Sequence, residues 1–178
     1  MDRTALETEL AALPILQYEW ISTRELTFSE RVRHVCETEC PMYGRAWSCP
    51  PGVGSVEVCR ARCLEYPEAL LLTTATEVRD AADMEETLAT RGAHEEITRQ
   101  AEHLLRSQGL ATYVLSTEAC TRCSRCTYPD APCRFPAEMY PCAESHGIVV
   151  TDLAEAYGIE FIAGNVVTWF SLIFFRAQ

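Results

Sequence analysis

The run EALLLTTA at residues 68–75 is compact and apolar, with the length and composition of a buried β-strand. A long helical pattern follows it, with Asp80 or Asp83 as the N-cap and Gly109 as the stop. The run LATYVLS at residues 110–116 then reads as a second strand. A strand, a helix and a strand in this order predict a right-handed crossover within one sheet.

The central helix carries apolar residues at helical spacing, which predicts the face that it turns toward the core. These positions are Met84, Leu88, Ile97, Ala101, Leu104 and Leu105. Gly92 is a point where the helix is expected to weaken. His94 and His103 lie on the same helix, far in sequence from any cysteine, and are expected to face solvent.

Outside this unit, the sequence predicts two further strands and three further helices. The strands are expected at residues 15–21 and 166–175, and the helices at 56–66, at 137–146 before Gly147, and from a Thr151 cap to Gly158. The predicted fold class is therefore α/β or α+β. We expect a single domain over residues 1–178, with a small central sheet, the strand–helix–strand crossover and two cysteine-rich metal-binding loops.

Composition excludes several functions. The chain has 178 residues and a formal net charge of −11, which disfavours binding to a phosphate backbone, so nucleic acid is not an expected partner. All 15 basic residues are arginine. Because Schiff-base chemistry, pyridoxal phosphate attachment and a Walker A loop each need a lysine, these three are excluded.

Whether the ten cysteines form disulfides or bind metal depends on the cellular compartment of the protein. The first residues lack the basic-then-apolar order of a signal peptide, and the apolar run at residues 166–175 is too short to span a membrane. We therefore expect a cytoplasmic protein without a membrane partner, in a compartment where disulfides are rare. Metal ligation is then the leading interpretation of the cysteines.

The cysteines fall into two sets of five, which predicts two metal sites. The first set spans residues 36–63 and contains Cys36, Cys40, Cys49, Cys59 and Cys63. The second set spans residues 120–142 and contains Cys120, Cys123, Cys126, Cys133 and Cys142.

The second set begins with three cysteines at two-residue gaps, similar to the ligand run of bacterial-type ferredoxins. Such gaps let one tight loop wrap three thiolates around one face of a cubane. We predict Cys120, Cys123, Cys126 and Cys133 as ligands of one [4Fe–4S] cluster, although the last gap, of six residues, is longer than the ferredoxin spacing. The alternative is a zinc ion bound by four cysteines, although zinc usually takes cysteines as two separated pairs.

Arginines are interleaved with the second set, at positions 122, 125 and 134. A [4Fe–4S] cluster with four thiolates carries about two negative charges in its oxidised form, which nearby guanidinium groups offset. The same cations favour thiolate over thiol. The arginines are therefore consistent with an anionic cluster.

In the first set, Cys36, Cys40 and Cys49 are predicted ligands, the latter two each followed by proline. Cys59 and Cys63 lie four residues apart on a predicted helix and so share a face. Either could complete the site as a fourth ligand, or both could be small buried hydrophobic residues. If neither binds, one iron of the cluster is left open to water or to a small substrate.

Taken together, the two cysteine patterns resemble a prokaryotic family of unknown function described as "predicted metal-binding protein". The motifs that carry the resemblance are Cys-x3-Cys-Pro-x-Tyr-Gly-x4-Cys-Pro-Pro and Cys-x2-Cys-x2-Cys-Thr-Tyr-Pro-x4-Cys-Arg-x-Pro, with Glu-Ser-His-Gly-Ile-Val-Val after the last cysteine, and the likeness covers roughly residues 32–161. It implies a metal and a role in anaerobic metabolism, but no substrate. The seven predicted ligands match the motifs, whereas Cys59, Cys63 and Cys142 lie outside them.

Three functions fit these observations. The first is an electron carrier or redox adaptor whose acidic surface docks on a redox partner protein. The second is an enzyme whose cluster has an open iron that binds a small-molecule substrate as a Lewis acid. The third is an interaction module stapled by zinc. His34 and His146 lie near cysteines but are expected to be surface or capping residues.

Overall fold

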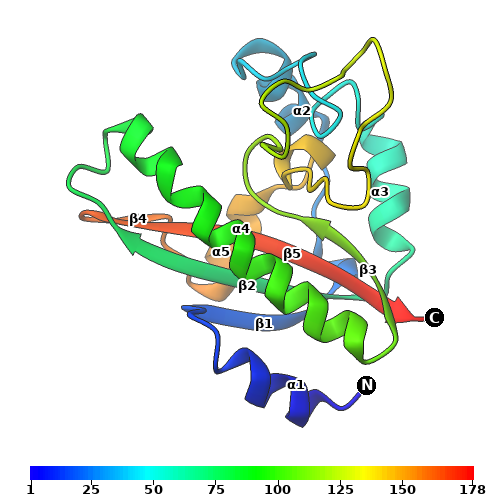
Figure 1. The fold of residues 1–178 in the computed structure, drawn as a ribbon, viewed down its shortest axis with the longest axis vertical. Helices are drawn as coiled ribbons and strands as arrows, with labels where there is room; N and C mark the ends of the chain where they lie inside the picture. The colour runs from blue at the N-terminus through cyan, green and yellow to red at the C-terminus, as the bar shows by residue number, and fades with distance from the viewer.

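The computed structural model describes residues 1–178, which form an antiparallel sheet covered by helices on both faces (Figure 1). The strands are β1 (Gln17–Ser22), β2 (Glu68–Glu77), β3 (Leu110–Leu115), β4 (Ile162–Ala163) and β5 (Val166–Ala177). Their order is β1-β2-β5-β3, with β4 paired to β5, and every pairing is antiparallel. The class is therefore α+β, one of the two that the sequence predicted.

The predicted crossover is present, but its two strands are not neighbours. Strands β2 and β3 both pair antiparallel with β5, so they run parallel to each other on either side of it. Helix α4 (Met84–Ser107) connects them. Ile173 of β5 lies between Leu70 of β2 and Val114 of β3. This central position explains why β5 is mostly apolar, because both of its faces are buried.

The two faces of the sheet bury separate apolar cores. On one face, Leu70, Leu72 and Ile173 pack with residues of α1 (Arg3–Leu10) and α4. On the other face, Leu71 and Phe174 pack with residues of α5 (Val150–Tyr157) and with Cys63 of α3 (Val56–Leu64). The alternation of side chains along β2 therefore sorts its leucines between the two layers.

Helix α4 begins as predicted, but its first half buries a different face. Asp83 caps it by accepting hydrogen bonds from the backbone N–H groups of Glu85 and Glu86, and Gly92 does not interrupt it. Met84 and Leu88 are exposed, which corrects the predicted apolar face. The buried residues of α4 are Thr87, Arg91, His94, Thr98, Ala101 and Leu105.

His94 is almost fully buried, so the expectation that it faces solvent was wrong, whereas His103 is exposed. The imidazole of His94 lies 2.9 Å from Thr74 Oγ1 and 2.7 Å from Ser171 Oγ. These hydroxyls of β2 and β5 satisfy both ring nitrogens, which makes burial of the ring tolerable. Burial lowers the pKa of His94 to about 4, so the ring is neutral at pH 7.

One predicted helix is mostly absent, and several short elements were not predicted. The predicted helix over residues 137–146 was wrong, because only its last turn is helical, as the 3₁₀ helix η2 (Glu144–His146) that ends at Gly147. Pro141 lies within that range, and a proline in a helix interior removes one hydrogen bond. Four elements were not predicted: the helices α1 and α2 (Glu30–Thr38), the short 3₁₀ helix η1 (Thr23–Glu25) and the two-residue strand β4. No helix has the length and apolar character needed to cross a lipid bilayer.

The cysteine-bearing segments gather at one end of the molecule. Figure 1 shows α2, the loop that follows it and the long loop between β3 and η2 at the top of the view, with α3 descending from there on the right. The site is thus built from two parts of the chain that are far apart in sequence.

Candidate metal centre

The first three predicted ligands are placed by α2 and the turn that follows it. Ser29 caps α2 by accepting the N–H of Arg31, and Cys36 lies in the last turn of the helix. Cys40 follows two residues beyond the helix end, and Cys49 is buried in a turn before Pro50.

Burial and neighbouring groups raise the pKa of two of these thiols. Burial raises the pKa of Cys36, and the Cys40 thiolate raises it further. Burial raises the pKa of Cys49 to about 11, against a hydrogen bond with Ser48, with smaller contributions from Cys40 and Cys36. The three predicted ligands of the first set thus lie on one segment, from α2 to the turn before Pro50, in surroundings that favour the neutral thiol until a cation binds.

A buried arginine supports this group. Arg33 of α2 is 7% exposed and donates to the carbonyl oxygens of Gly54, at 2.8 Å, and of Ser145, at 2.6 Å. Its Nε has no hydrogen-bond partner within the protein. The guanidinium also opposes the rise in the pKa of Cys36. Arg33 thus ties α2 to two separate turns and places a positive charge beside the first set.

Cys59 and Cys63 are buried together on α3, and the Cys59 sulfur lies 3.9 Å from Arg33 Nη2. Both are fully buried, and Cys63 belongs to the core cluster beneath the sheet. The Cys59 thiol donates to the carbonyl oxygen of Val53 at 3.5 Å. The shared helix face was confirmed, and the contacts are those of small core residues.

The four predicted ligands of the second set face a common space. Cys120, Cys123, Cys126 and Cys133 all line one narrow pocket, together with Trp47, Ser48, Arg122, Phe135 and Met139. Burial raises the pKa of Cys120, and the thiolates of Cys133 and Cys123 add to that effect. Residues 117–143 contain no helix or strand, so the four thiols are carried by a loop.

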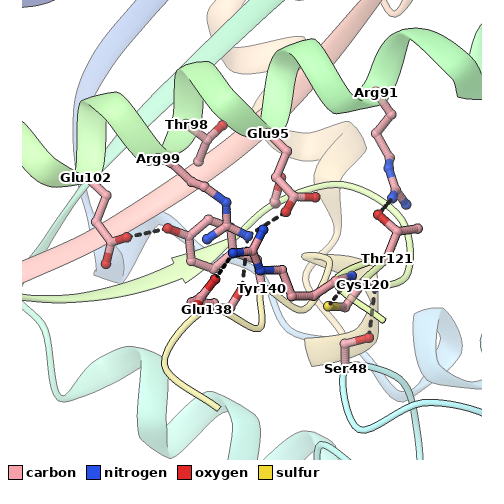
Figure 2. A network of polar contacts seen from close by, with 12 residues as sticks. Ser48, Arg91, Glu95, Thr98, Arg99, Glu102, Cys120, Thr121, Glu138 and Tyr140 are labelled. Atoms are coloured by element: carbon pink, nitrogen blue, oxygen red, sulfur yellow. Dashed lines mark hydrogen bonds and ion pairs between the residues drawn. The ribbon is translucent and has the colours of Figure 1, made fainter. Parts of the chain in front are cut away.

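Helix α4 anchors this loop from one side (Figure 2). Arg91, which is 8% exposed, donates to the carbonyl oxygen of Ala119 at 2.6 Å and to the hydroxyl of Thr121. Arg99 donates to the carbonyl oxygen of Glu138 at 2.9 Å, and its guanidinium lies 4.2 Å from the centre of the Tyr140 ring. The helix therefore holds both ends of the loop.

The arginines within the loop also have partners. Arg122 forms an ion pair with Glu138 and lines the pocket of the four cysteines. Arg134 donates to the carbonyl oxygen of Arg125 at 2.9 Å, which closes the loop on itself. Of the three arginines predicted from sequence to offset cluster charge, Arg122 is therefore the one that lines the pocket.

The two cysteine regions contact each other directly. Ser48 Oγ accepts the backbone N–H of Cys120 at 3.0 Å, and the indole N–H of Trp47 donates to the carbonyl oxygen of Ala131 at 2.9 Å. Cys49 and Cys126 meet in one small apolar cluster with Ala46, Ala119 and Met42. Two metal groups held here would therefore be neighbours.

Below the first set lies a buried histidine. His146 is fully buried, so the expectation of a surface residue was wrong, whereas His34 is exposed. Its Nε2 lies 2.5 Å from the hydroxyl of Tyr113, and Nδ1 lies 3.0 Å from Ser145 Oγ. Burial lowers its pKa to about 3, so the ring is neutral at pH 7 and acts as a structural hydrogen-bonding group.

A cavity of about 610 Å³ opens beside the second set. Its walls include Cys133, Trp47, Arg62, Tyr113, Asp130 and Met139. Arg62 Nη1 lies 3.4 Å from the hydroxyl of Tyr113, so a cation and a phenol face the space next to one predicted ligand.

No three His, Cys, Asp or Glu side chains converge closely enough to surround a single metal ion. The donors in both regions are thiols, which suit iron–sulfur clusters and zinc better than hard cations such as Mg²⁺. The chemistry of the donor set therefore fits either a cluster or zinc.

Sequence reasoning missed the two arginines that hold these regions, Arg33 and Arg91. For Arg91 a signal exists, because Ala101 and Leu105 define a helical face that continues backward through residues 98, 94, 91 and 87. No comparable pattern marks Arg33.

Comparison with protein families agrees with the cysteine motifs. A family described as "Predicted metal-binding protein (DUF2284)" matches residues 19–175, nearly the whole chain. The chain belongs to this family. Searches of curated proteins and of solved structures each found no match.

Proposed function

We propose that this member of the predicted metal-binding family holds two [4Fe–4S] clusters and works in the cytoplasm as an electron carrier or redox adaptor in anaerobic metabolism. The second cluster would be bound by Cys120, Cys123, Cys126 and Cys133. The first would take Cys36, Cys40 and Cys49. The observation that carries the proposal is the shared pocket of the four second-set cysteines.

A positive charge and apolar side chains in the wall of that pocket support an anionic cluster there. Arg122 contributes a guanidinium to the wall, while Trp47, Phe135 and Met139 supply apolar cover. A nearby cation stabilises the more negative, reduced state, and exclusion of water preserves the thiolate bonds. A bound cluster supplies one-electron chemistry, and these residues hold it and tune its potential.

The closeness of the two regions supports electron transfer. Cys49 and Cys126 share one apolar cluster, so the chain places a potential route between the sites through packed side chains. The chain is also strongly acidic, with a net charge of −11. A basic redox partner protein would therefore be attracted electrostatically.

The cavity favours a second candidate, an iron–sulfur enzyme acting on a small molecule. The space of about 610 Å³ lies beside Cys133, with Arg62 and Tyr113 on its wall. A volume of this size suits a small ligand. This candidate requires an iron that a substrate can reach.

The third candidate is a zinc-stapled module. It requires four sulfurs to converge to about 2.3 Å from one ion. The second set would have to contract to do so, because no three candidate side chains converge on one point. Metal analysis separates this candidate from the other two.

The test is anaerobic purification followed by iron, sulfide and zinc analysis and EPR. Two clusters give about eight irons and eight sulfides per chain. Cys123→Ala should halve both, because it removes one ligand of the second site. Cys63→Ala is the matched control, since its thiol is buried in the core, and it should keep full loading. A wild-type protein with zinc and no sulfide would refute the proposal.

A further inference from the structure

The fourth ligand of the first site is the remaining question, and Cys142 is the candidate. By sequence it belongs with the second set, but it does not line the pocket of Cys120, Cys123, Cys126 and Cys133. Cys142 directly precedes Ala143, the N-cap residue of η2.

The sheet fixes the backbone of Cys142. Ser116, just after β3, donates its N–H to the carbonyl oxygen of Pro141 at 2.8 Å and forms a parallel bridge with Cys142. Ser145 closes the turn, because its hydroxyl donates to the carbonyl oxygen of Cys142 at 2.6 Å. The position of this thiol is therefore set by regular structure, unlike that of the loop cysteines.

The same turn lies against the first set. Cys36 Sγ lies 3.9 Å from the carbonyl oxygen of Glu144, and Cys142 Sγ accepts the backbone N–H of Ser145 at 3.3 Å. Arg33 of α2 donates to the carbonyl oxygen of Ser145 at 2.6 Å, which draws the helix of Cys36 onto η2. Two thiols from distant parts of the chain thus flank one three-residue turn.

Cys40 and Cys49 follow Cys36 on the segment that leaves α2, and α2 packs against η2. Ser48, beside Cys49, accepts the backbone N–H of Cys120 at 3.0 Å, and Ser116 forms a bridge with Cys142. The segment that carries Cys36, Cys40 and Cys49 therefore lies alongside the turn that carries Cys142.

The other candidates for a fourth ligand are otherwise engaged. Cys63 is enclosed by the core beneath the sheet. The Cys59 thiol donates to the carbonyl oxygen of Val53 and lies 3.9 Å from Arg33 Nη2.

We propose that Cys142 is the fourth ligand of the first cluster, together with Cys36, Cys40 and Cys49. The inference rests on the proposed function, since it assigns a ligand to one of its two sites. Four protein thiolates close that site, so no iron in it is open to water or substrate. Any catalytic iron would then have to lie in the second site, next to the cavity, and the first site would serve electron transfer alone.

The test compares single and paired alanine variants of anaerobically loaded protein by iron and sulfide content and EPR. Cys142→Ala should lower iron from about eight to about four per chain, or leave a three-iron cluster in the first site. Cys36→Ala should give the same loss. Adding Cys142→Ala to Cys36→Ala should remove no further iron, whereas adding it to Cys123→Ala should remove nearly all of it.

The pairing makes the outcome independent of a general folding defect, because a misfolded Cys142→Ala protein would lose iron on every background. Cys59→Ala is the matched control for a buried thiol close to the first set and should keep full loading. Full iron in Cys142→Ala, or additive loss with Cys36→Ala, would overturn the assignment while leaving two-cluster binding intact. A wild-type protein without iron and sulfide would instead overturn the proposed function, and the assignment with it.

Discussion

The two cysteine regions use the same chemistry on different supports. The first is partly built on regular structure: Cys36 lies on α2, Cys142 is bridged to the residue after β3, and Arg33 joins α2 to the turn at Ser145, whereas the other two cysteines lie in the loop after α2. The second lies on a loop with no helix or strand, and its ties to the rest of the fold run mainly to α4 and to Ser48. A backbone held by regular hydrogen bonds keeps its shape without metal, whereas a loop of this kind depends on its ligands.

Metal removal should therefore affect the second region most. We expect amide hydrogen exchange in residues 120–135 to become about a thousandfold faster in the apo-protein, equivalent to about 4 kcal/mol. Residues of α2 and η2 should change by less than about tenfold, because their backbone hydrogen bonds remain. Hydrogen exchange with mass spectrometry on anaerobic holo- and apo-protein measures both.

Residues of β5 serve as the internal reference for that experiment, since they form the centre of the sheet and contain no predicted ligand. If amide hydrogen exchange became equally faster in both cysteine regions, the proposed difference in their supports would be wrong. Unchanged protection in residues 120–135 would show that the loop is rigid without metal.

A second contrast concerns pH, through the buried histidine of α4. The pKa of His94 is lowered to about 4 from about 6.5, so the unfolded state binds the proton more readily. The stabilisation from the neutral ring is complete above pH 6.5 and is lost as the pH falls toward 4. The loss is at most about 3 kcal/mol.

Urea denaturation of the apo-protein between pH 7 and 4 measures this loss of stability. His94→Gln cannot be protonated, so its stability should fall less steeply over that range. His103→Gln, exposed on the same helix, is the matched control and should follow the wild type. No charged group is hydrogen-bonded to the His94 ring, whose partners are the hydroxyls of Thr74, Thr98 and Ser171. Parallel pH profiles for His94→Gln and the wild type would contradict this account.

The fold was largely predictable, because its decisive segments are long and strongly patterned. The runs that became β2 and β3, and the caps of α4, were found in the sequence within a few residues. The insertion of β5 between β2 and β3 was not predicted, since strand order depends on contacts that are distant in sequence. Four of the seven motif cysteines, those of the second set, line one pocket as their spacing suggested, and metal binding by all seven stays a prediction.

Polar burial was the part that sequence patterns could not predict. Arg91 and His94 lie on the same face as Ala101 and Leu105, but their chemistry suggests solvent. They are buried because hydroxyls and carbonyl oxygens from β2, β5 and the cysteine loop satisfy them. Cys142 belongs to the second set by sequence, but it does not line the pocket of the other four cysteines, and it forms a bridge with Ser116.

The arginine of the first region allows a sharper test of its rigidity. Arg33→Met keeps most of the side-chain volume but leaves the carbonyl oxygens of Gly54 and Ser145 without their donor. Each charge-assisted hydrogen bond contributes about 1.5–3 kcal/mol to stability. Removing the guanidinium also removes the cost of burying its charge, which offsets part of the lost stability. We expect a net destabilisation of about 2 kcal/mol by urea denaturation.

Arg31→Met is the control for that variant, because Arg31 is exposed on the same helix and should change stability by less than about 0.5 kcal/mol. If Arg33 ties α2 to η2, its loss should also speed hydrogen exchange in η2 but not in residues 120–135. An effect confined to the second loop would mean that the two regions do not have separate supports.

The smallest expected effect belongs to Arg91, the counterpart of Arg33 in the second region. Arg91→Met removes donors to Ala119 and Thr121, but Thr121 is exposed and water can replace the donor there. We therefore expect Arg91→Met to lower the free energy of unfolding by only about 1 kcal/mol. The effect on the metal site should be larger than the effect on global stability, because Cys120 is one residue from both contacts. We expect the second site to lose its iron to a chelator about fivefold faster than in the wild type, as followed by EPR. Arg106→Met, on the exposed side of the same helix with one long ion pair to Glu102, should leave that rate unchanged. A large global destabilisation by Arg91→Met with no change in the rate of iron loss would place Arg91 in the core of the fold and would leave the second loop to be held by its metal alone.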